Sequence, residues 1–245
     1  AAAANSNLKR AWMELGGKSP NIVFADCPDM EGAAAAAAGN VFYNQGESCN
    51  APTRLYVEAS IKDAFMKKVA AHVASFQPGD PLDPATTMGA IVDDIQMNGV
   101  LKYIESGKTE GAELIAGGQQ CRQESGGYFI EPTIFVTNKN HTIAREEIFG
   151  PVLSAMTFET EAEAIALAND SIYGLQAGVW TADISRAHRV ARALKAGTVH
   201  INQYNDDDIT VPFGGYKQSG NGRDKSLHSM DKYCELKTTW IKIDY

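Results

Sequence analysis

The sequence has no hydrophobic run long enough to cross a membrane, no closely spaced cysteines and no excess of basic residues. Its 245 residues contain no apolar stretch near the ~20 residues that span a bilayer, and the N-terminus lacks the pattern of a secretory signal. The formal net charge is −8, whereas a nucleic-acid-binding protein needs a concentrated basic surface. We therefore predict a cytoplasmic protein that binds neither a membrane nor nucleic acid.

Cysteine is scarce and scattered. The four cysteines are Cys27, Cys49, Cys121 and Cys234. Their spacing matches neither a zinc site nor a disulfide framework, so we expect free thiols in a reducing compartment and no metal site. The chain also begins abruptly, because four alanines lead to an active-site-like motif within twenty residues. We expect an N-terminal part of the protein to precede this chain.

Short apolar runs that are rich in strand-forming residues alternate with stretches of helical periodicity. The expected strands are Asn21–Ala25, Arg54–Glu58, Ala112–Ala116, Val152–Phe158, Gln176–Trp180 and Thr198–Asn202. The expected helices are Met30–Tyr43, Ile61–Phe76, Ile91–Ser106, Glu161–Asn169 and Ile184–Lys195. This alternation predicts an α/β fold with a mostly parallel sheet and helices on both faces.

The pattern changes after Gly222. A short polar helix is followed by an extended run, Tyr233–Ile243. A terminal strand with unpaired backbone groups invites a second chain, so we interpret this run as a C-terminal oligomerisation strand and expect a homo-oligomer, a dimer or a tetramer. A strand that completes the chain's own sheet explains the pattern equally well.

Cys49 differs from the other cysteines in its surroundings. Residues 44–52 read Asn-Gln-Gly-Glu-Ser-Cys-Asn-Ala-Pro and connect an alanine-rich helix to a strand, which places Cys49 in a loop. Ser48 and Asn50 supply polar groups that could stabilise a thiolate or an oxyanion, and Gly46 permits unusual backbone angles. Most cysteines are inert and buried, which is our interpretation of the other three. We predict that Cys49 is a nucleophile.

A second segment carries a carboxylate that could serve as a base. Residues 14–20 read Glu-Leu-Gly-Gly-Lys-Ser-Pro, in which paired glycines let the chain turn sharply into the next strand. Taken alone, Glu14 would be a solvated glutamate.

Together, these two segments resemble the signatures of the aldehyde dehydrogenase superfamily. Three further stretches, at 146–152, 169–175 and 212–220, are similar to later signatures of the family and occur in the same order. The resemblance covers most of the chain. It implies the end of a cofactor-binding domain and a crossover at 1–20, a catalytic domain at 21–222 and an oligomerisation segment at 223–245.

The resemblance also implies roles for individual residues. Cys49 would attack the aldehyde carbon to give a thiohemiacetal, which expels hydride to NAD, or to NADP, and leaves a thioester that water activated by Glu14 hydrolyses. Glu147 would bind the nicotinamide ribose, Phe149 would pack beside the nicotinamide, and Gln96 would also contact the cofactor. Most of the family's cofactor-binding domain precedes the Glu14 motif, so we expect this chain to lack it.

The substrate is expected to be a small aldehyde, held in a pocket to which we assign Ser48, Asn50, Tyr204 and Asp207. The three aspartates at 206–208 favour an aldehyde that carries an amine or a guanidinium, although a solvated acidic turn explains them equally well. The stretch from Val211 to Lys237 is similar to bacterial enzymes of putrescine breakdown that oxidise γ-glutamyl-γ-aminobutyraldehyde or guanidinobutyraldehyde. We predict an aminoaldehyde or a related polyamine-derived aldehyde.

Two other functions stay open at this point. The chain could belong to a relative that transfers the thioester to coenzyme A or phosphate, but such relatives commonly lack the glutamate at position 14, so its presence favours hydrolysis. The chain could also be an inactive, truncated domain kept for packing or oligomerisation, an alternative that the presence of both Cys49 and Glu14 disfavours.

Overall fold

A seven-stranded sheet forms the centre of the computed structural model, which describes residues 1–204 and 208–244. The strand order is β10-β9-β2-β3-β8-β7-β4, and every neighbouring pair is parallel except β4 with β7. The strands are β2 (Pro20–Val23), β3 (Arg54–Glu58), β4 (Glu113–Ala116), β7 (Thr133–Val136), β8 (Val152–Phe158), β9 (Gln176–Trp180) and β10 (Thr198–Ile201). The predicted mostly parallel α/β fold is confirmed.

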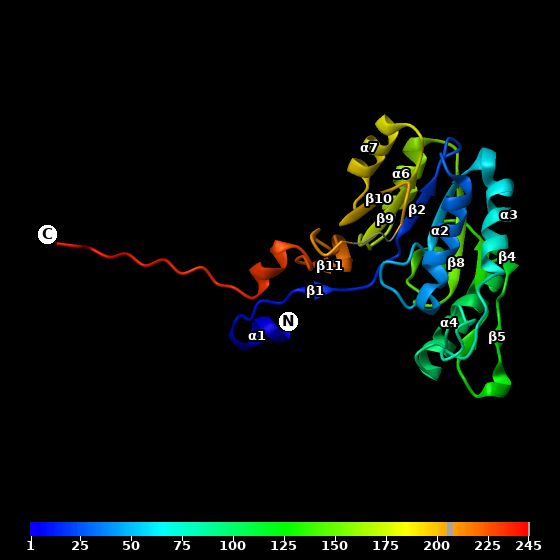
Figure 1. Ribbon diagram of the computed structural model, residues 1–245, viewed down its shortest axis with the longest axis horizontal. Helices are drawn as coiled ribbons and strands as arrows, with labels where there is room; N and C mark the ends of the chain where they lie inside the picture. The colour runs from blue at the N-terminus through cyan, green and yellow to red at the C-terminus, as the bar shows by residue number, and fades with distance from the viewer. Residues whose placement is uncertain (205–207, 245) are drawn as a thin grey trace.

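Helices cover both faces of this sheet (Figure 1). They are α2 (Met30–Phe42) and α3 (Lys62–Val73) on one face, and α6 (Glu161–Asn169) and α7 (Ile184–Ala193) on the other. Successive strand residues point to opposite faces. Leu55 and Val57 of β3 accordingly pack in the core on the α2–α3 side, whereas Tyr56 between them packs in the core on the α6–α7 side.

A third apolar cluster lies beside β7 and β8, where α4 (Asp94–Thr109) packs against the short helix α5 (Thr142–Arg145). We predicted that the longer helix would start at Ile91. It starts after Asp93 because the Asp93 carboxylate accepts the backbone N–H of Gln96 (2.8 Å) and caps the helix.

Several short strands were not predicted. They are β7, the hairpin of β5 (Gln120–Cys121) and β6 (Phe129–Ile130), and the pair of β1 (Met13–Glu14) and β11 (Gly220–Asn221). Each has four residues or fewer, which is too short for an alternating pattern to stand out.

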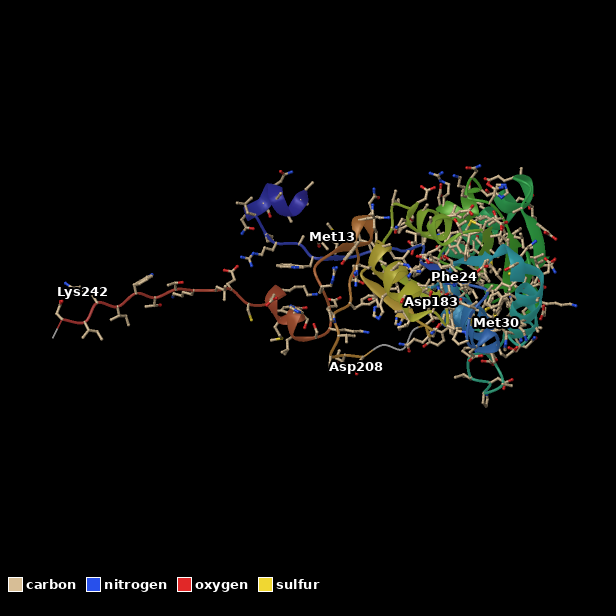
Figure 2. The ribbon with its side chains drawn as sticks, turned by 90° about the horizontal axis from the view of Figure 1, so that it is seen from above. Met13, Phe24, Met30, Asp183, Asp208 and Lys242 are labelled. Atoms are coloured by element: carbon tan, nitrogen blue, oxygen red, sulfur yellow. The ribbon has the colours of Figure 1, made fainter. Side chains whose placement is uncertain are left out.

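Both terminal regions extend away from the sheet. The N-terminal helix α1 (Ala2–Asn7) lies near β1, and after a helical turn at Leu227–Lys232 the last residues lead away from the body, as the position of Lys242 shows (Figures 1 and 2). Within the described residues, 233–244 join no sheet. A strand needs a partner edge for its hydrogen bonds, so the expected strand is not formed in the single chain, and the alternative that it completes the chain's own sheet is wrong.

The helices show no sign of a membrane segment. Among the described residues, no helix combines the length and the apolar composition that a bilayer crossing requires.

Candidate active site

Four of the five signature segments meet at one edge of the sheet. Residues 14–20, 44–52, 146–152 and 169–175 lead directly into β2, β3, β8 and β9, which are neighbours in the order β9-β2-β3-β8. Since these strands are parallel, their amino ends lie at the same edge. Open α/β sheets usually bind ligands at the carboxyl ends of their strands. Here the candidate residues gather at the opposite edge.

The paired glycines of the first signature let it pack against two other signatures. A Cβ atom at Gly16 would overlap the carboxylate of Glu147, and one at Gly17 would overlap the backbone carbonyl of Cys49. The Gly17 N–H donates a hydrogen bond to Glu147 Oε1 (2.9 Å). The two glycines are therefore required for close approach, and they bring the nucleophile loop and the Glu147 carboxylate to the same stretch of backbone.

The turn that carries Cys49 has an uncommon backbone. Asn44 and Gln45 have φ of 50° and 58°, and Gly46 has φ of 75°. A Cβ atom at Gly46 would also overlap the carbonyl of Gly150 in the third signature. Left-handed non-glycine residues are disfavoured and cluster at functional sites, which is consistent with the predicted role of this loop.

Cys49 is half-buried, and its thiol is surrounded by negative charge. Burial raises the pKa of the Cys49 thiol most, and the charges of Glu14 and Glu147 raise it further, while the backbone N–H groups of Cys49 and Asn50 act in the opposite direction. The structure thus brings the predicted nucleophile, the predicted base and the predicted ribose-binding carboxylate into electrostatic range of one another. The same N–H groups can stabilise negative charge next to the sulfur.

Glu14 lies on β1, opposite Gly220 of β11. Burial raises the pKa of the Glu14 carboxyl, and the N–H of Gly215 and the positive charges of Arg223 and Lys232 partly offset this effect. These three residues belong to the fifth signature and to the segment that follows it. A carboxyl with a raised pKa is better suited to accept a proton near neutral pH than an ordinary glutamate.

Ser219 of the fifth signature connects three segments, a role that the sequence did not reveal. Its buried hydroxyl donates to the carbonyl of Gly16 (2.7 Å) and accepts the N–H of Gly174 (3.0 Å), and its carbonyl accepts the N–H of Leu15 (3.1 Å). The two residues that follow Glu14 and the segment before β9 are therefore joined to each other through Ser219. The only available signal was a serine inside a glycine-rich motif.

The polar side chains assigned to the substrate pocket form a network behind Cys49. Ser48 Oγ donates to Asn50 Oδ1 (2.7 Å), Asn50 Nδ2 donates to Gln176 Oε1 (3.3 Å), and the Tyr204 hydroxyl donates to the Asn50 carbonyl (2.7 Å). These bonds order the loop that carries the nucleophile. Their part in binding a substrate stays a prediction.

Two of the three aspartates of the acidic run, Asp206 and Asp207, lie outside the described residues. Asp208 is described and exposed, and its carboxylate accepts the N–H of Thr210 (2.8 Å). This hydrogen bond lowers the pKa of Asp208. A hydrogen bond from an aspartate to the N–H two residues later is typical of a solvent-exposed turn, so Asp208 fits the alternative of a solvated acidic turn.

The residues assigned to the cofactor lie together at the same edge. Glu147 is half-buried, and burial raises the pKa of its carboxyl against the opposing effects of the Gly17 N–H and the Lys18 charge. Phe149 is 39% exposed and has φ of 53°. Gln96 Nε2 donates to the carbonyls of Phe149 (2.7 Å) and Ile148 (3.1 Å), so its amide holds the Phe149 loop in place.

This arrangement fits a nicotinamide nucleotide. A carboxylate can accept hydrogen bonds from ribose hydroxyls, and an exposed aromatic ring two residues away offers a face for a flat heterocycle. Glu147 Oε2 accepts no hydrogen bond from any residue that the structure describes, which leaves an acceptor for such hydroxyls.

The remaining cysteines do not form a second site. Cys27 and Cys121 are half-buried, and burial raises the pKa of both thiols. Cys234 is exposed, so the prediction that it is buried is wrong. It lies in the C-terminal segment, which extends away from the sheet.

Known proteins with similar sequences and structures are aldehyde dehydrogenases. A model of the "Aldehyde dehydrogenase family" matches residues 1–239. The chain is 55% identical to the NADP/NAD-dependent aldehyde dehydrogenase PuuC of Escherichia coli (strain K12), over 99% of this chain and 48% of that protein. It is 61% identical to an indole-3-acetaldehyde dehydrogenase solved with NAD+, with a TM-score of 0.97 over 98% of this chain and 49% of that one.

A second solved structure, a γ-glutamyl-γ-aminobutyraldehyde dehydrogenase from Burkholderia cenocepacia J2315, is 57% identical, with a TM-score of 0.95 over 97% of this chain and 48% of that one. The chain spans about half the length of the relatives that it matches. With the family model matched along nearly its whole length and the five signatures joined at one site, the chain belongs to the aldehyde dehydrogenase family.

Proposed function

We propose that the protein containing this chain oxidises an aldehyde to the carboxylic acid, with NAD or NADP as the oxidant and Cys49 as the nucleophile. The observation that carries this proposal is that Glu14 and Glu147 both act electrostatically on the Cys49 thiol at one edge of the sheet. Family membership supports it. The half-length match makes it a proposal for the whole protein.

In the first half of the reaction, the Cys49 thiol loses its proton to a base and its sulfur bonds to the aldehyde carbon. The carbonyl electron pair moves to oxygen, and the backbone N–H of Cys49 is placed to stabilise this oxyanion. When the oxyanion reforms the carbonyl, hydride leaves the carbon and a thioester remains on Cys49. The nicotinamide cofactor, when bound, accepts that hydride.

In the second half, Glu14 takes a proton from water while the water oxygen attacks the thioester carbon. The carbon–sulfur bond then breaks, Cys49 leaves as the thiolate and the acid is released. Partial desolvation of the Glu14 carboxyl supports this step, since it raises the pKa of this group in an otherwise exposed residue. If coenzyme A or phosphate accepted the acyl group instead of water, Glu14 would have no water to activate.

The cofactor residues follow from the fit described above. Glu147 would bind the ribose hydroxyls, Phe149 would pack beside the nicotinamide, and Gln96 would contact the cofactor or hold Phe149 through its carbonyl. Together, these three residues would orient a bound nicotinamide cofactor for hydride transfer from the carbon bonded to Cys49.

For the substrate, we propose an aminoaldehyde or a related polyamine-derived aldehyde. Two observations support a substrate with a polar or cationic chain. One is the aldehyde named for the solved relative from Burkholderia cenocepacia, and the other is the acidic run at 206–208. Ser48, Asn50, Tyr204 and Asp207 are the side chains proposed to line its pocket. An aldehyde survey that includes a neutral aromatic aldehyde, such as the indole-3-acetaldehyde of the other solved relative, would test this assignment.

The proposal also covers the domain boundaries and the oligomeric state of the protein. Residues 1–20 would end a cofactor-binding domain, 21–222 would form the catalytic domain, and 223–245 would join copies of the protein into a dimer or tetramer. A nucleophilic thiol stays reduced in the cytoplasm, which is where we place the protein.

Two variants of the full-length protein test the chemistry. Cys49→Ala should lower aldehyde oxidation by several orders of magnitude, because no covalent intermediate can form. Glu14→Gln should leave the pre-steady-state burst of reduced cofactor intact and slow the later turnover, since hydride transfer precedes hydrolysis. Near wild-type turnover of Cys49→Ala would refute the nucleophile, and loss of the burst in Glu14→Gln would refute the assignment of the base.

A further inference from the structure

Lys18 is a buried lysine to which the proposed reaction assigns no role. Its side chain is 1% exposed, and its ammonium nitrogen has no hydrogen-bond partner among the described residues. An unpaired buried charge is costly, so lysines in such positions are rare and need a reason. Lys18 follows directly after Gly17, whose N–H holds the Glu147 carboxylate.

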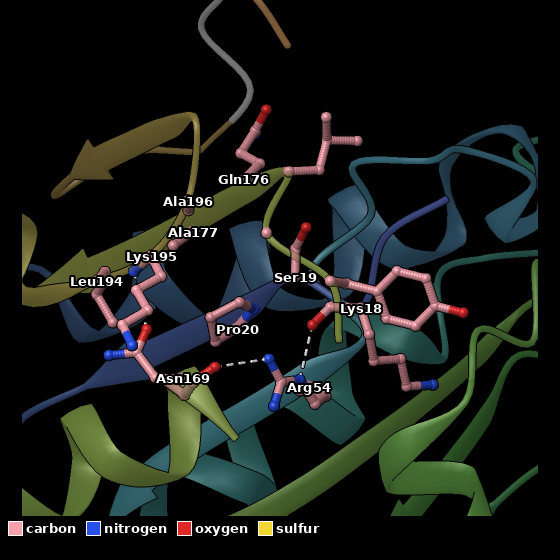
Figure 3. A pocket seen from close by; sticks show the side chains of 14 residues that line it. Lys18, Ser19, Pro20, Arg54, Asn169, Gln176, Ala177, Leu194, Lys195 and Ala196 are labelled. Atoms are coloured by element: carbon pink, nitrogen blue, oxygen red, sulfur yellow. Dashed lines mark hydrogen bonds between the residues drawn. The ribbon is translucent and has the colours of Figure 1, made fainter. Parts of the chain in front are cut away.

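Arg54 is a second buried cation that acts on Lys18, and among the described residues it donates hydrogen bonds to neutral groups. Its Nε donates to the Lys18 carbonyl (2.7 Å), and its other nitrogens donate to the Tyr56 hydroxyl and to the carbonyls of Leu167 and Ala168. Figure 3 shows the Lys18 side chain running away from the Arg54 guanidinium. The charge of Arg54 repels the Lys18 ammonium, whereas the charges of Glu147 and Glu146 in the third signature attract it.

We propose that Lys18 is a positioning residue that acts through Glu147. When Lys18 is protonated, its ammonium is the buried counter-charge that favours the ionised Glu147 carboxylate against Gly17, where this carboxylate can accept hydrogen bonds from the cofactor ribose. This inference rests on the proposed function of Glu147. The ammonium acts through its field, which is strong in a water-excluded interior and needs no direct hydrogen bond.

The electrostatics of both groups agree with this role. Burial and the charge of Arg54 lower the pKa of Lys18 to about 7, against the charges of Glu147 and Glu146. Burial raises the pKa of Glu147, against the Gly17 N–H and the Lys18 charge. Tyr173, before β9, also faces Glu147, and burial followed by the Glu147 charge raises its pKa. Loss of the Lys18 charge should therefore raise the pKa of Glu147 further.

The first test measures the coupling without any turnover. In protein labelled with ¹³C-lysine, the Lys18 resonance is assigned by its absence from Lys18→Met and is followed by NMR as the pH is changed. We expect it to titrate near pH 7 in the wild type and at a lower pH in Glu147→Gln, because the attracting anion is gone.

Glu146→Gln is the matched control. Glu146 is the adjacent carboxylate, is exposed and accepts a hydrogen bond from Tyr103 (2.8 Å), so its removal should shift Lys18 less. Titration of Lys18 together with the surface lysines, or an unchanged titration in Glu147→Gln, would overturn the proposal.

The second test separates positioning from packing in the full-length protein. Lys18→Met keeps the length of the side chain but removes its charge, and it should raise the KM for NAD about tenfold, the size expected for weakening hydrogen bonds to a charged acceptor. The rise should be larger at acid pH, where Glu147 becomes protonated, and kcat should change less.

In a Glu147→Gln background, Lys18→Met should add nothing to the rise in KM. An equal rise at every pH and in both backgrounds would indicate a packing role and refute the proposal. If the wild type oxidised no aldehyde, the proposed function would fail, whereas the NMR titration would still decide whether Lys18 and Glu147 are coupled. The two failures are therefore distinguishable.

Discussion

At the scale of single residues, the two carboxylates oppose the charged form of the nucleophile. Burial raises the pKa values of Cys49, Glu14 and Glu147, and both carboxylates act on the thiol through their negative charges. The resting site therefore favours a protonated Cys49. A protonated thiol is less prone to oxidation than a thiolate, so this arrangement protects the nucleophile until the reaction begins.

The electrostatic effect of Glu14 on Cys49 can be measured by alkylation. The Glu14 charge raises the pKa of Cys49, so Glu14→Gln should lower that pKa and increase the thiolate fraction at a given pH. The midpoint of the pH dependence of iodoacetamide alkylation at Cys49 should move to lower pH.

Glu47→Gln is the control for this shift. Glu47 is a half-buried carboxylate of the same loop, and it accepts the N–H of Val92 (3.2 Å). The carboxylates that raise the pKa of Cys49 are instead Glu14 and Glu147. Glu47→Gln should leave the alkylation midpoint in place. A midpoint that stays put or rises in Glu14→Gln would show that Glu14 does not repel the thiolate.

The acidic run makes a prediction about substrates. Replacement of Asp206, Asp207 and Asp208 by asparagine should raise the KM for cationic aminoaldehydes more than for neutral aldehydes, because the negative field that attracts cations is removed. Steady-state kinetics with one aldehyde of each kind, matched in length, would measure the difference. Equal effects on both would mean that these aspartates form a solvated turn.

Sequence could propose roles for residues whose chemistry is carried by their own motif, such as Cys49 and Glu14. It could not assign roles to Lys18 and Ser219, although both lie inside recognised signatures. Their roles depend on contacts across 130 positions, from Gly17 to Glu147, and 203 positions, from Ser219 to Gly16. Such neighbours are created by the fold.

At the scale of elements, six of the seven strands of the central sheet were predicted, and β7 was not. The bounds of β3, β8 and β9 agree with those expected, because each is rich in strand-forming residues and is largely buried on both faces. Strand β7 has only four residues and follows Pro132, so no period emerges before it ends. The amino-edge position of the site needed the strand order, which no local pattern contains.

The turn from α2 into the Cys49 loop is predicted to require glycine. Gly46→Ala would place a Cβ on the Gly150 carbonyl at a positive φ, so we expect a loss of about 1–3 kcal/mol in unfolding free energy and a melting temperature lower by several degrees. Thermal unfolding followed by circular dichroism would measure it.

Gly39→Ala is the matched control because Gly39 lies inside α2 and a Cβ there meets nothing within 4 Å. Alanine at this helical position should stabilise the protein by about 0.5–1 kcal/mol. Gly46→Ala melting at or above the wild-type temperature would contradict the close-approach argument.

At the scale of the whole molecule, the C-terminal segment carries apolar side chains that the rest of the described chain leaves uncovered. Leu236, Trp240 and Ile241 are 105%, 92% and 78% exposed on an extended segment that no other described element covers. Exposed apolar side chains beside unpaired backbone groups are typical of an association surface. The sequence predicted the extended conformation, but a partner that belongs to another copy cannot be read from one chain.

The proposed oligomer can be tested at this segment. Leu236→Asp combined with Trp240→Asp should lower the molar mass measured by light scattering after size-exclusion chromatography, because two charges would have to be buried against the neighbouring copy. Leu82→Asp is the control, since Leu82 is 90% exposed in a loop of the catalytic body and should leave the mass unchanged. A double variant that keeps the wild-type mass, or a wild type that is already monomeric, would exclude residues 233–244 as the contact between copies, since a contact made by these side chains cannot survive their replacement by buried carboxylates.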